Sequence, residues 1–202
     1  MPRMHTPTAV TRTLTLAAAT AAVALPALVV HAQDAVQWRV EDGGNGHWYE
    51  FVLRPEILSW GEAQQASESR SGHLVTLTSA PENQFIATQF NGLESGQTWI
   101  GLIQDTTAPD YSEPGGGWKW VTGEAFSWSN WFIGANGGGE PNNGGSPDEP
   151  REEWGNLWFS GGDQSDDYIG TWNDNVFLDE DRSDSYIIEW SADCNGDGIV
   201  DY

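Results

Sequence analysis

Cysteine is almost absent from this chain of 202 residues, because Cys194 is its only one. A single cysteine cannot form a disulfide within the chain, so the fold must be held by its hydrophobic core, by a bound metal, or by both. Basic residues are also scarce: 8 lysines and arginines stand against 30 acids, and the formal net charge is −22. Nucleic acids and anionic membrane surfaces would repel so negative a chain, and we expect neither as a partner.

Long apolar runs are missing beyond the first 32 residues, so no later segment is expected to cross a membrane. Residues 1–32 have the composition of a signal peptide. Arg3 and Arg12 form a positively charged start, an apolar stretch runs from Leu14 to Val30, and small residues follow. We expect cleavage before Gln33 and export, which leaves a secreted or cell-surface protein that is not inserted in a membrane. An uncleaved membrane anchor is the alternative, and Pro26 within the apolar stretch disfavours it.

Residues that commonly carry catalysis are few. Beyond the predicted signal peptide, only His47 and His73 remain among the histidines, and the lone cysteine has no evident partner. No serine lies in a nucleophile elbow. Carboxylate pairs occur throughout so acidic a chain, so they are weak evidence for glycosidase chemistry. We therefore expect a binding protein and not an enzyme.

Twelve tryptophans stand out among the residues that are present, and each can bury on the order of 200 Å² in a core. Ser59–Arg70 has the composition of a helix with Ser59 as its N-cap. A second helix is predicted from Ser79 to about residue 91, with Ser79 and Glu82 forming a reciprocal capping box. Aromatic and β-branched segments predict strands at residues 37–40, 47–53, 73–77, 98–103, 117–121, 155–159 and 185–190.

Two short clusters of oxygen-bearing side chains dominate the carboxy-terminal half. Glu140-Pro141-Asn142 lies in the glycine-rich stretch 134–145, and Trp172-Asn173-Asp174 follows about thirty residues later. The acidic pair Glu152-Glu153 lies between them. The clusters contain carboxylates and amides but no histidine or cysteine, which is a ligand set for a hard cation, and calcium is the first candidate.

These motifs, in this order and at these separations, resemble the C-type lectin-like domain. The resemblance covers residues 33–190. It implies an α+β fold in which two helices flank small antiparallel sheets, the ends of the domain pair, and a long loop region binds calcium. The family usually carries two disulfides, which this chain lacks. The resemblance rests on Trp48-Tyr49, Gly72 to Leu77, Trp99 to Leu102, Trp118-Lys119-Trp120 with Gly123, Asn130-Trp131, the two clusters above, and Tyr186 to Trp190.

The resemblance also implies that one set of residues binds calcium and a sugar together. Pro141 is expected to follow a cis peptide bond. The Glu-Pro-Asn order is the family's mannose-type arrangement, which favours sugars with equatorial vicinal hydroxyls. A calcium-stabilised adhesion or protein-binding module without sugar recognition is the alternative. The predicted ligands are Glu140, Asn142, Glu152, Asn173 and Asp174, with Glu153, Glu149 and Asp148 as alternatives for the place of Glu152.

Two further calcium sites follow from resemblance. A second site in the domain would use Asp105, Glu113 and Glu153. Residues 191–202 resemble the first calcium loop of a dockerin module, cut off before the last acidic position and the helix that should follow. A cohesin-like partner is therefore expected only if the tail is completed. The loop's oxygen ligands would be Asp193, Asn195, Asp197, the Ile199 carbonyl and Asp201.

Overall fold

The computed structural model describes residues 31–32, 34–93, 97–134, 138–145, 151–159, 168–176 and 183–191. Three sequence predictions lie outside these ranges and remain predictions. They are the signal peptide before residue 31, the alternative ligands Asp148 and Glu149, and the tail loop from Asp193 to Asp201.

Two α-helices and a mostly antiparallel sheet form the domain, which confirms the predicted α+β class. The helices are α1 (Trp60–Glu68) and α2 (Ala80–Gln89), with short 3-10 helices η1 (Val40–Asp42) and η2 (Asn143–Gly145). The strands are β1 (His31–Ala32), β2 (Val36–Gln37), β3 (Trp48–Leu53), β4 (His73–Leu74), β5 (Gln97–Gln104), β6 (Trp118–Trp120), β7 (Trp154–Trp158), β8 (Trp172–Asn175) and β9 (Ser183–Trp190).

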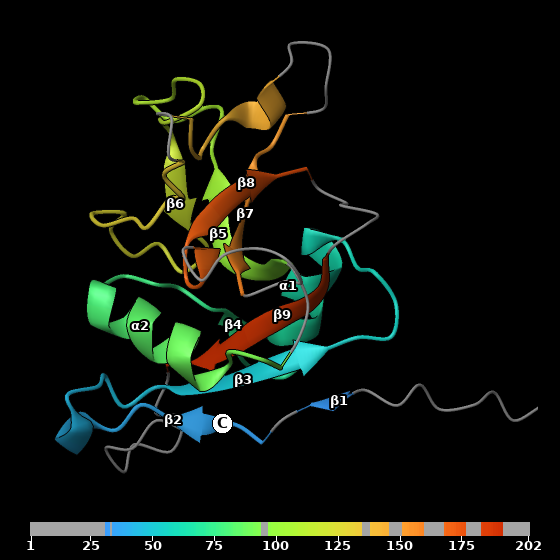
Figure 1. Ribbon diagram of the computed structural model, residues 1–202, viewed down its shortest axis with the longest axis vertical. Coiled ribbons are helices and arrows are strands. Elements are labelled where there is room, and N and C mark those ends of the chain that lie inside the picture. Colours follow the sequence, from blue (N-terminus) through green and yellow to red (C-terminus); the bar gives the residue numbers. More distant parts are fainter. Residues whose placement is uncertain are drawn as a thin grey trace, which may run out of the picture.

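The strands follow the order β1-β3-β9-β5-β7-β8, with β2 on β3, β4 on β9 and β6 on β5. Strands β3 and β9 pair antiparallel from Trp48↔Trp190 to Leu53↔Ser185, so the two ends of the domain are joined as predicted. The helices lie with β3 and β9 in the lower part of Figure 1, and β6, β7 and β8 lie in the upper part. Strand β5 connects the two parts by pairing with β9 on one side and β7 on the other.

Both helices begin at serine caps, but the two caps differ. At α1, Ser59 Oγ accepts from the Glu62 amide at 3.3 Å, and the Glu62 carboxylate accepts from the Ser59 amide at 2.8 Å, which completes a capping box. At α2, Ser79 Oγ accepts from the Glu82 amide at 3.3 Å. The predicted return bond is wrong, because the Glu82 carboxylate accepts from the Thr78 amide at 2.8 Å instead.

Tryptophan forms much of the core, as predicted from composition. Two indoles tie α1 to the central strand: Trp60 Nε1 donates to the Ile100 carbonyl and Trp99 Nε1 donates to the Leu58 carbonyl, each at 2.8 Å. Such bonds satisfy the one polar atom of a buried indole. The buried tryptophans are Trp60, Trp99, Trp118, Trp120, Trp172 and Trp190.

Several elements differ from the sequence prediction. Strand β2 covers only Val36–Gln37, whereas the sequence predicts a strand at residues 37–40, and Val40 begins the 3-10 helix η1 instead. Strand β4 has two residues instead of the predicted five. Strand β1 includes the last two residues of the predicted signal peptide, so the predicted cleavage would remove it. Strand β8 was not predicted, because asparagine and aspartate are depleted in strands. It forms because it pairs along its whole length with β7.

Candidate functional site

Strand β8 presents two of the predicted ligands from a buried position. Asn173 lies opposite Asn156 of β7, and Asp174 lies opposite Gly155. Asn173 is 8% exposed and Asp174 only 1%. A carboxylate withdrawn from water in this way is costly unless a proton, donors or a cation compensate its charge.

The Glu140 loop is attached to β8 through Phe132. The Phe132 amide donates to the Trp172 carbonyl at 3.0 Å, and the Glu140 amide donates to the Phe132 carbonyl at 2.8 Å. The Glu140–Pro141 peptide bond is cis, as the sequence predicts. Backbone pairing therefore brings the two clusters together across some thirty residues of sequence, in the upper part of Figure 1.

The Asp174 carboxylate holds the loop that follows Pro141. It accepts hydrogen bonds from the Asn142 amide at 2.9 Å and from the Asn143 amide at 2.7 Å. Asn142 itself is exposed, so its side chain is open to solvent. Asp174 thus lies directly against the Glu-Pro-Asn segment.

Glu152 contacts the same loop. Its carboxylate accepts from the Gly144 amide, and its own amide donates to Asn143 Oδ1 at 3.0 Å. The neighbouring Glu153 has its carbonyl bonded to the Gln104 amide of β5 at 2.8 Å. Of these two, Glu152 is the residue whose carboxylate is seen on the loop.

Glu140 and Asp174 interact as a pair of carboxyl groups. The pKa of Glu140 is raised to about 8. Burial is the largest cause, followed by the charge of Asp174, a hydrogen bond to Asp174 and the charge of Glu152. Burial also raises the pKa of Asp174. Hydrogen bonds from the backbone N–H groups of Asn142 and Asn143 oppose that rise. Asp174 is buried and Glu140 is half-buried, so charging both carboxyl groups without a counter-ion is unfavourable, and the pair favours holding one proton.

The donors at this site fit calcium. Within the described residues, Glu140 Oε2 is shielded from solvent and has no hydrogen-bond partner. An unsatisfied buried carboxylate oxygen beside a second carboxylate leaves a place for a cation. The donor set is made of oxygen atoms only, and hard cations such as calcium prefer oxygen.

A polar network that the sequence did not reveal holds the start of β8. Asn83 of α2 donates to the Gly170 carbonyl at 2.9 Å and accepts from Trp172 Nε1 at 2.8 Å. Asn130 donates to the same carbonyl at 2.7 Å. These contacts fix the turn that precedes the two β8 ligands. The only sequence signal for this role is an asparagine on the buried side of a predicted helix.

A second network supports the middle of β7 and the end of β8. Gln97 Oε1 accepts from Asn156 Nδ2 and from Asn175 Nδ2, each at 2.6 Å. All three residues are buried. The amides link β5, β7 and β8, and Asn156 lies directly opposite the candidate ligand Asn173. Nothing in the sequence singled them out.

Two of the three residues of the predicted second calcium site, Asp105 and Glu113, have other side-chain partners here. Asp105 forms an ion pair with Lys119 at 2.8 Å, and that pair together with bonds from Thr107 holds the pKa of Asp105 below its usual range. Glu113 accepts from the Tyr111 hydroxyl at 2.5 Å. The second site stays a prediction.

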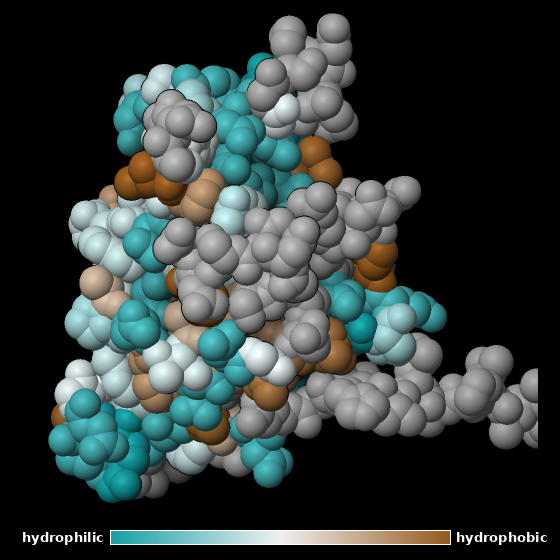
Figure 2. Space-filling model, viewed as in Figure 1, coloured by the Kyte–Doolittle hydropathy of each residue, from teal (hydrophilic) through white to brown (hydrophobic). Residues whose placement is uncertain are grey.

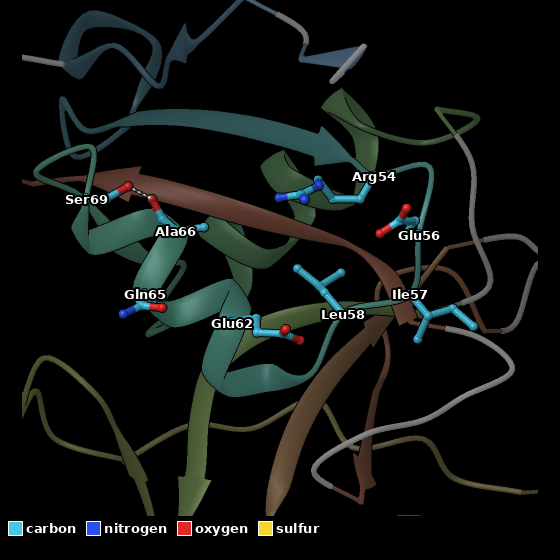
Figure 3. Close-up of a pocket in the computed structure, with 8 residues that line it drawn as sticks. All are labelled: Arg54, Glu56, Ile57, Leu58, Glu62, Gln65, Ala66 and Ser69. Atoms are coloured by element: carbon cyan, nitrogen blue, oxygen red, sulfur yellow. Dashed lines mark hydrogen bonds between the residues drawn. The ribbon is translucent and has the colours of Figure 1, made fainter. Parts of the chain in front are cut away.

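A hollow of about 510 Å³ lies between α1 and the segment that follows β3 (Figure 3). It contains none of the predicted ligands. Glu62 in its wall already caps α1. The lining residues are Arg54, Glu56, Ile57, Leu58, Glu62, Gln65, Ala66 and Ser69.

The molecular surface shows no large apolar patch on the face in Figure 2, as far as its residues are described. Brown residues there form small separate groups among hydrophilic ones. The exposed large hydrophobic residues in the described ranges are Val40, Ile57 and Ile133. No helix within the described residues is long and apolar enough to span a membrane.

Known proteins identify the family. The profile of the "Lectin C-type domain" matches residues 56–157, which is half of the chain. The chain therefore belongs to the C-type lectin domain family. Members are typically carbohydrate-recognition domains without enzymatic activity, generally bind calcium, and are mostly secreted or on the cell surface.

Individual relatives agree with this assignment. Regenerating islet-derived protein 3-alpha of Mus musculus is 34% identical over 88 residues, which cover 42% of this chain and 48% of the relative. Asialoglycoprotein receptor 1 of Mus musculus is 31% identical over 115 residues, which cover 52% of this chain and 34% of the receptor. In both, the match spans less than half of the relative's own length.

Solved structures share the fold. The mouse scavenger receptor C-type lectin carbohydrate-recognition domain has a TM-score of 0.50 and 26% identity, covering 70% of this chain and 88% of that one. The cow CD23 carbohydrate-recognition domain has a TM-score of 0.51 and 23% identity, covering 74% and 91%. These likenesses confirm the predicted C-type lectin fold.

Proposed function

We propose that this protein binds carbohydrate in a calcium-dependent manner at the site formed by the Glu140 loop and β8. The observation that carries the proposal is geometric: the buried Asp174 carboxylate binds the backbone of the Glu140-Pro141-Asn142 loop, and the shielded Glu140 Oε2 has no hydrogen-bond partner within the described residues. The proposed calcium ligands, which also contact the sugar, are Glu140, Asn142, Glu152, Asn173 and Asp174.

The residues around the ion would select the sugar through hydrogen bonds. Calcium takes six to eight oxygen ligands, so when bound it would offer positions to two neighbouring sugar hydroxyls. The Asn142 and Asn173 amides would each use an NH₂ group to donate to a hydroxyl oxygen. The Glu140 and Glu152 carboxylates would accept the hydroxyl protons.

The Glu-Pro-Asn order supports mannose-type sugars, which carry equatorial vicinal hydroxyls. The names of two relatives support carbohydrate binding in general and not a particular sugar: a carbohydrate-recognition domain at 26% identity and the asialoglycoprotein receptor at 31%. We further propose that the chain is exported after cleavage near residue 32. A cohesin-like partner belongs to this proposal only if the tail loop is completed.

Thermal unfolding with calcium and with EDTA, together with a glycan array under both conditions, tests the function. We expect calcium to raise the melting temperature and to be required for binding to mannose-type glycans. Asn173→Ala should lose both effects. Sugar binding that ignores EDTA would overturn the proposal. A calcium-induced melting shift without any glycan binding would favour the adhesion module instead.

The fifth ligand has its own matched comparison. Glu152→Gln should weaken calcium binding at the Glu140 site, whereas Glu153→Gln makes the same chemical change one residue away and should leave binding at that site unchanged. A loss of calcium binding in Glu153→Gln with none in Glu152→Gln would reverse the assignment.

A further inference from the structure

A polar cluster that the proposed site does not use joins five separate parts of the chain. We call it the His47 cluster. It lies where the amino-terminal hairpin, residues 36–49, meets β9 and α2. Its two buried carboxylates, Glu82 and Glu189, are 2% and 1% exposed. Its members are His47 before β3, Thr76 after β4, Glu82 in α2, Glu124 after β6 and Glu189 in β9.

His47 is the direct partner of the most buried acid. Its Nδ1 lies 2.6 Å from Glu189 Oε1, and its side chain is 22% exposed, so it exchanges protons with solvent. The other Glu189 oxygen accepts from the Thr76 amide at 2.8 Å. A buried carboxylate needs such compensation, and a protonated imidazole supplies both a hydrogen bond and the opposite charge.

The cluster is short of hydrogens. Thr76 Oγ1 lies 2.8 Å from a Glu124 oxygen and 3.0 Å from a Glu189 oxygen. A hydroxyl carries one hydrogen and can donate it to only one carboxylate. At the other contact, the hydroxyl oxygen and the carboxylate oxygen face each other without a hydrogen between them. A proton on His47 therefore reduces the repulsion within the cluster.

Glu82 adds a third negative charge. One ligand atom from each of His47, Glu82 and Glu189 lies within 4.8 Å of the others, a spacing that a divalent cation could also bridge. The Glu82 oxygen already accepts from Asn45 Nδ2 and from the Tyr49 hydroxyl, each at 2.8 Å. Because donors already occupy these oxygens, a proton on His47 is the better counter-charge than a metal.

His73 is the other basic group nearby. Its Nδ1 lies 3.9 Å from a Glu189 oxygen, and its two ring nitrogens bond to the Leu74 carbonyl and to Ser191 Oγ, each at 3.0 Å. Within the described residues, His47 and His73 are the basic side chains that contact the cluster's carboxylates. Of the two, His47 is the one at hydrogen-bond distance from a carboxylate of the cluster.

The balance of these effects fixes the direction of titration. Burial lowers the pKa of His47, but the hydrogen bond and charge of Glu189, with the charges of Glu82 and Glu124, raise it above 6.5 overall. Burial and the Glu189 charge raise the pKa of Glu82. A histidine with a raised pKa stabilises the fold fully below 6.5 and loses that contribution as the pH rises through the raised value.

We propose that a proton on His47 controls how firmly the amino-terminal hairpin, residues 36–49, is held against β9 and α2. With the proton bound, His47 neutralises Glu189 and the hairpin is closed. Without it, three carboxylates face one another and the hairpin opens locally. The hairpin bonds at stake run from the Trp38 amide to the His47 carbonyl at 3.0 Å and from the Gly46 amide to the Trp38 carbonyl at 2.8 Å.

The test is a pH series from 6 to 8.5 on the full chain in EDTA. NMR would follow the His47 imidazole, and amide exchange would report protection at Trp38 and Gly46. We expect His47 to titrate above 6.5, with protection of both amides falling about tenfold and the melting temperature falling by roughly 2–4 °C across the same range. In His47→Gln, this pH-dependent fall in amide protection and melting temperature should be absent. In His73→Gln it should remain.

Three results would overturn the proposal. One is a His47 titration at or below 6.5 in the unmutated chain, which needs no variant to fold. Another is a pH-dependent loss of hairpin protection that survives in His47→Gln. The third is an effect present without EDTA and absent with it, because a bound cation would then be the cause. None of these outcomes depends on whether the protein binds sugar.

Discussion

Replacing Glu140 by glutamine should stabilise the calcium-free protein while removing its response to calcium. The pKa of about 8 for this carboxyl lies well above the ordinary value of 4.5. A group whose folded pKa is raised costs no stability below pH 4.5, costs progressively more up to about pH 8, and then levels off. Glutamine keeps the shape and carries no charge, so Glu140→Gln removes that cost.

The size of the effect follows from the pKa difference. Each pKa unit corresponds to about 1.4 kcal/mol. Because the side chain is partly exposed and shares its proton with Asp174, solvent screening and sharing reduce the cost at pH 7.5 to about 1–2 kcal/mol. For a domain of this size, that corresponds to a rise of roughly 2–8 °C in melting temperature.

Differential scanning calorimetry in EDTA at pH 4.5 and pH 7.5 would measure this change in melting temperature. Glu140→Gln should melt above the unmutated protein at pH 7.5 and at nearly the same temperature at pH 4.5. In excess calcium the order should reverse, because only the unmutated site gains the ion. Glu153→Gln is the matched control and should change little. A variant less stable in EDTA at pH 7.5, or a gain that is equal at both pH values, would refute the reasoning.

Three further outcomes follow from the structure. Asn83→Ala removes the acceptor of the Trp172 indole and a donor to the turn before β8; urea unfolding should show a loss of about 2–4 kcal/mol, and a loss below 0.5 would contradict the network. Gly155→Ala would place a Cβ 2.7 Å from Leu102 Cβ, so calorimetry should show a loss of about 1–3 kcal/mol, and an unchanged melting temperature would mean that the contact yields freely. Calcium affinity should fall as the pH drops below about 8, because the proton on Glu140 must leave before the ion binds. Isothermal titration at pH 6 and 8 should show proton release on binding. Equal affinities at the two pH values would disprove the competition between proton and calcium.

The elements with strong local signals could be predicted from the sequence. Serine caps and apolar spacing located both helices, and a buried apolar run located the central strand β5. The alternation in Trp118-Lys119-Trp120 placed both indoles on the buried side and left Lys119 exposed, as observed. These features depend on neighbours within a few residues, which is why a single sequence reveals them.

Features decided by distant contacts could not be predicted. Strand β8 has poor strand propensity and forms because β7 pairs with it. The Glu82 carboxylate bonds to the Thr78 amide and not to the Ser79 amide, and its other oxygen accepts from Tyr49 of β3, a partner that is distant in the sequence. The role of Asn83 likewise depends on Trp172, 89 residues away. Motif resemblance named the candidate ligands, whereas only the fold shows Asp174 holding the Asn142 backbone.

The most direct test of the proposed function is a titration of methyl α-mannoside and methyl α-galactoside into the protein, with calcium and with EDTA. Isothermal calorimetry or NMR shifts would follow the binding. Weak binding of the mannoside in calcium, none in EDTA, and no comparable binding of the galactoside is the result we expect. Mannoside binding that persists in EDTA, or its absence from a protein that demonstrably binds calcium through Asn173 and Asp174, would contradict the proposal.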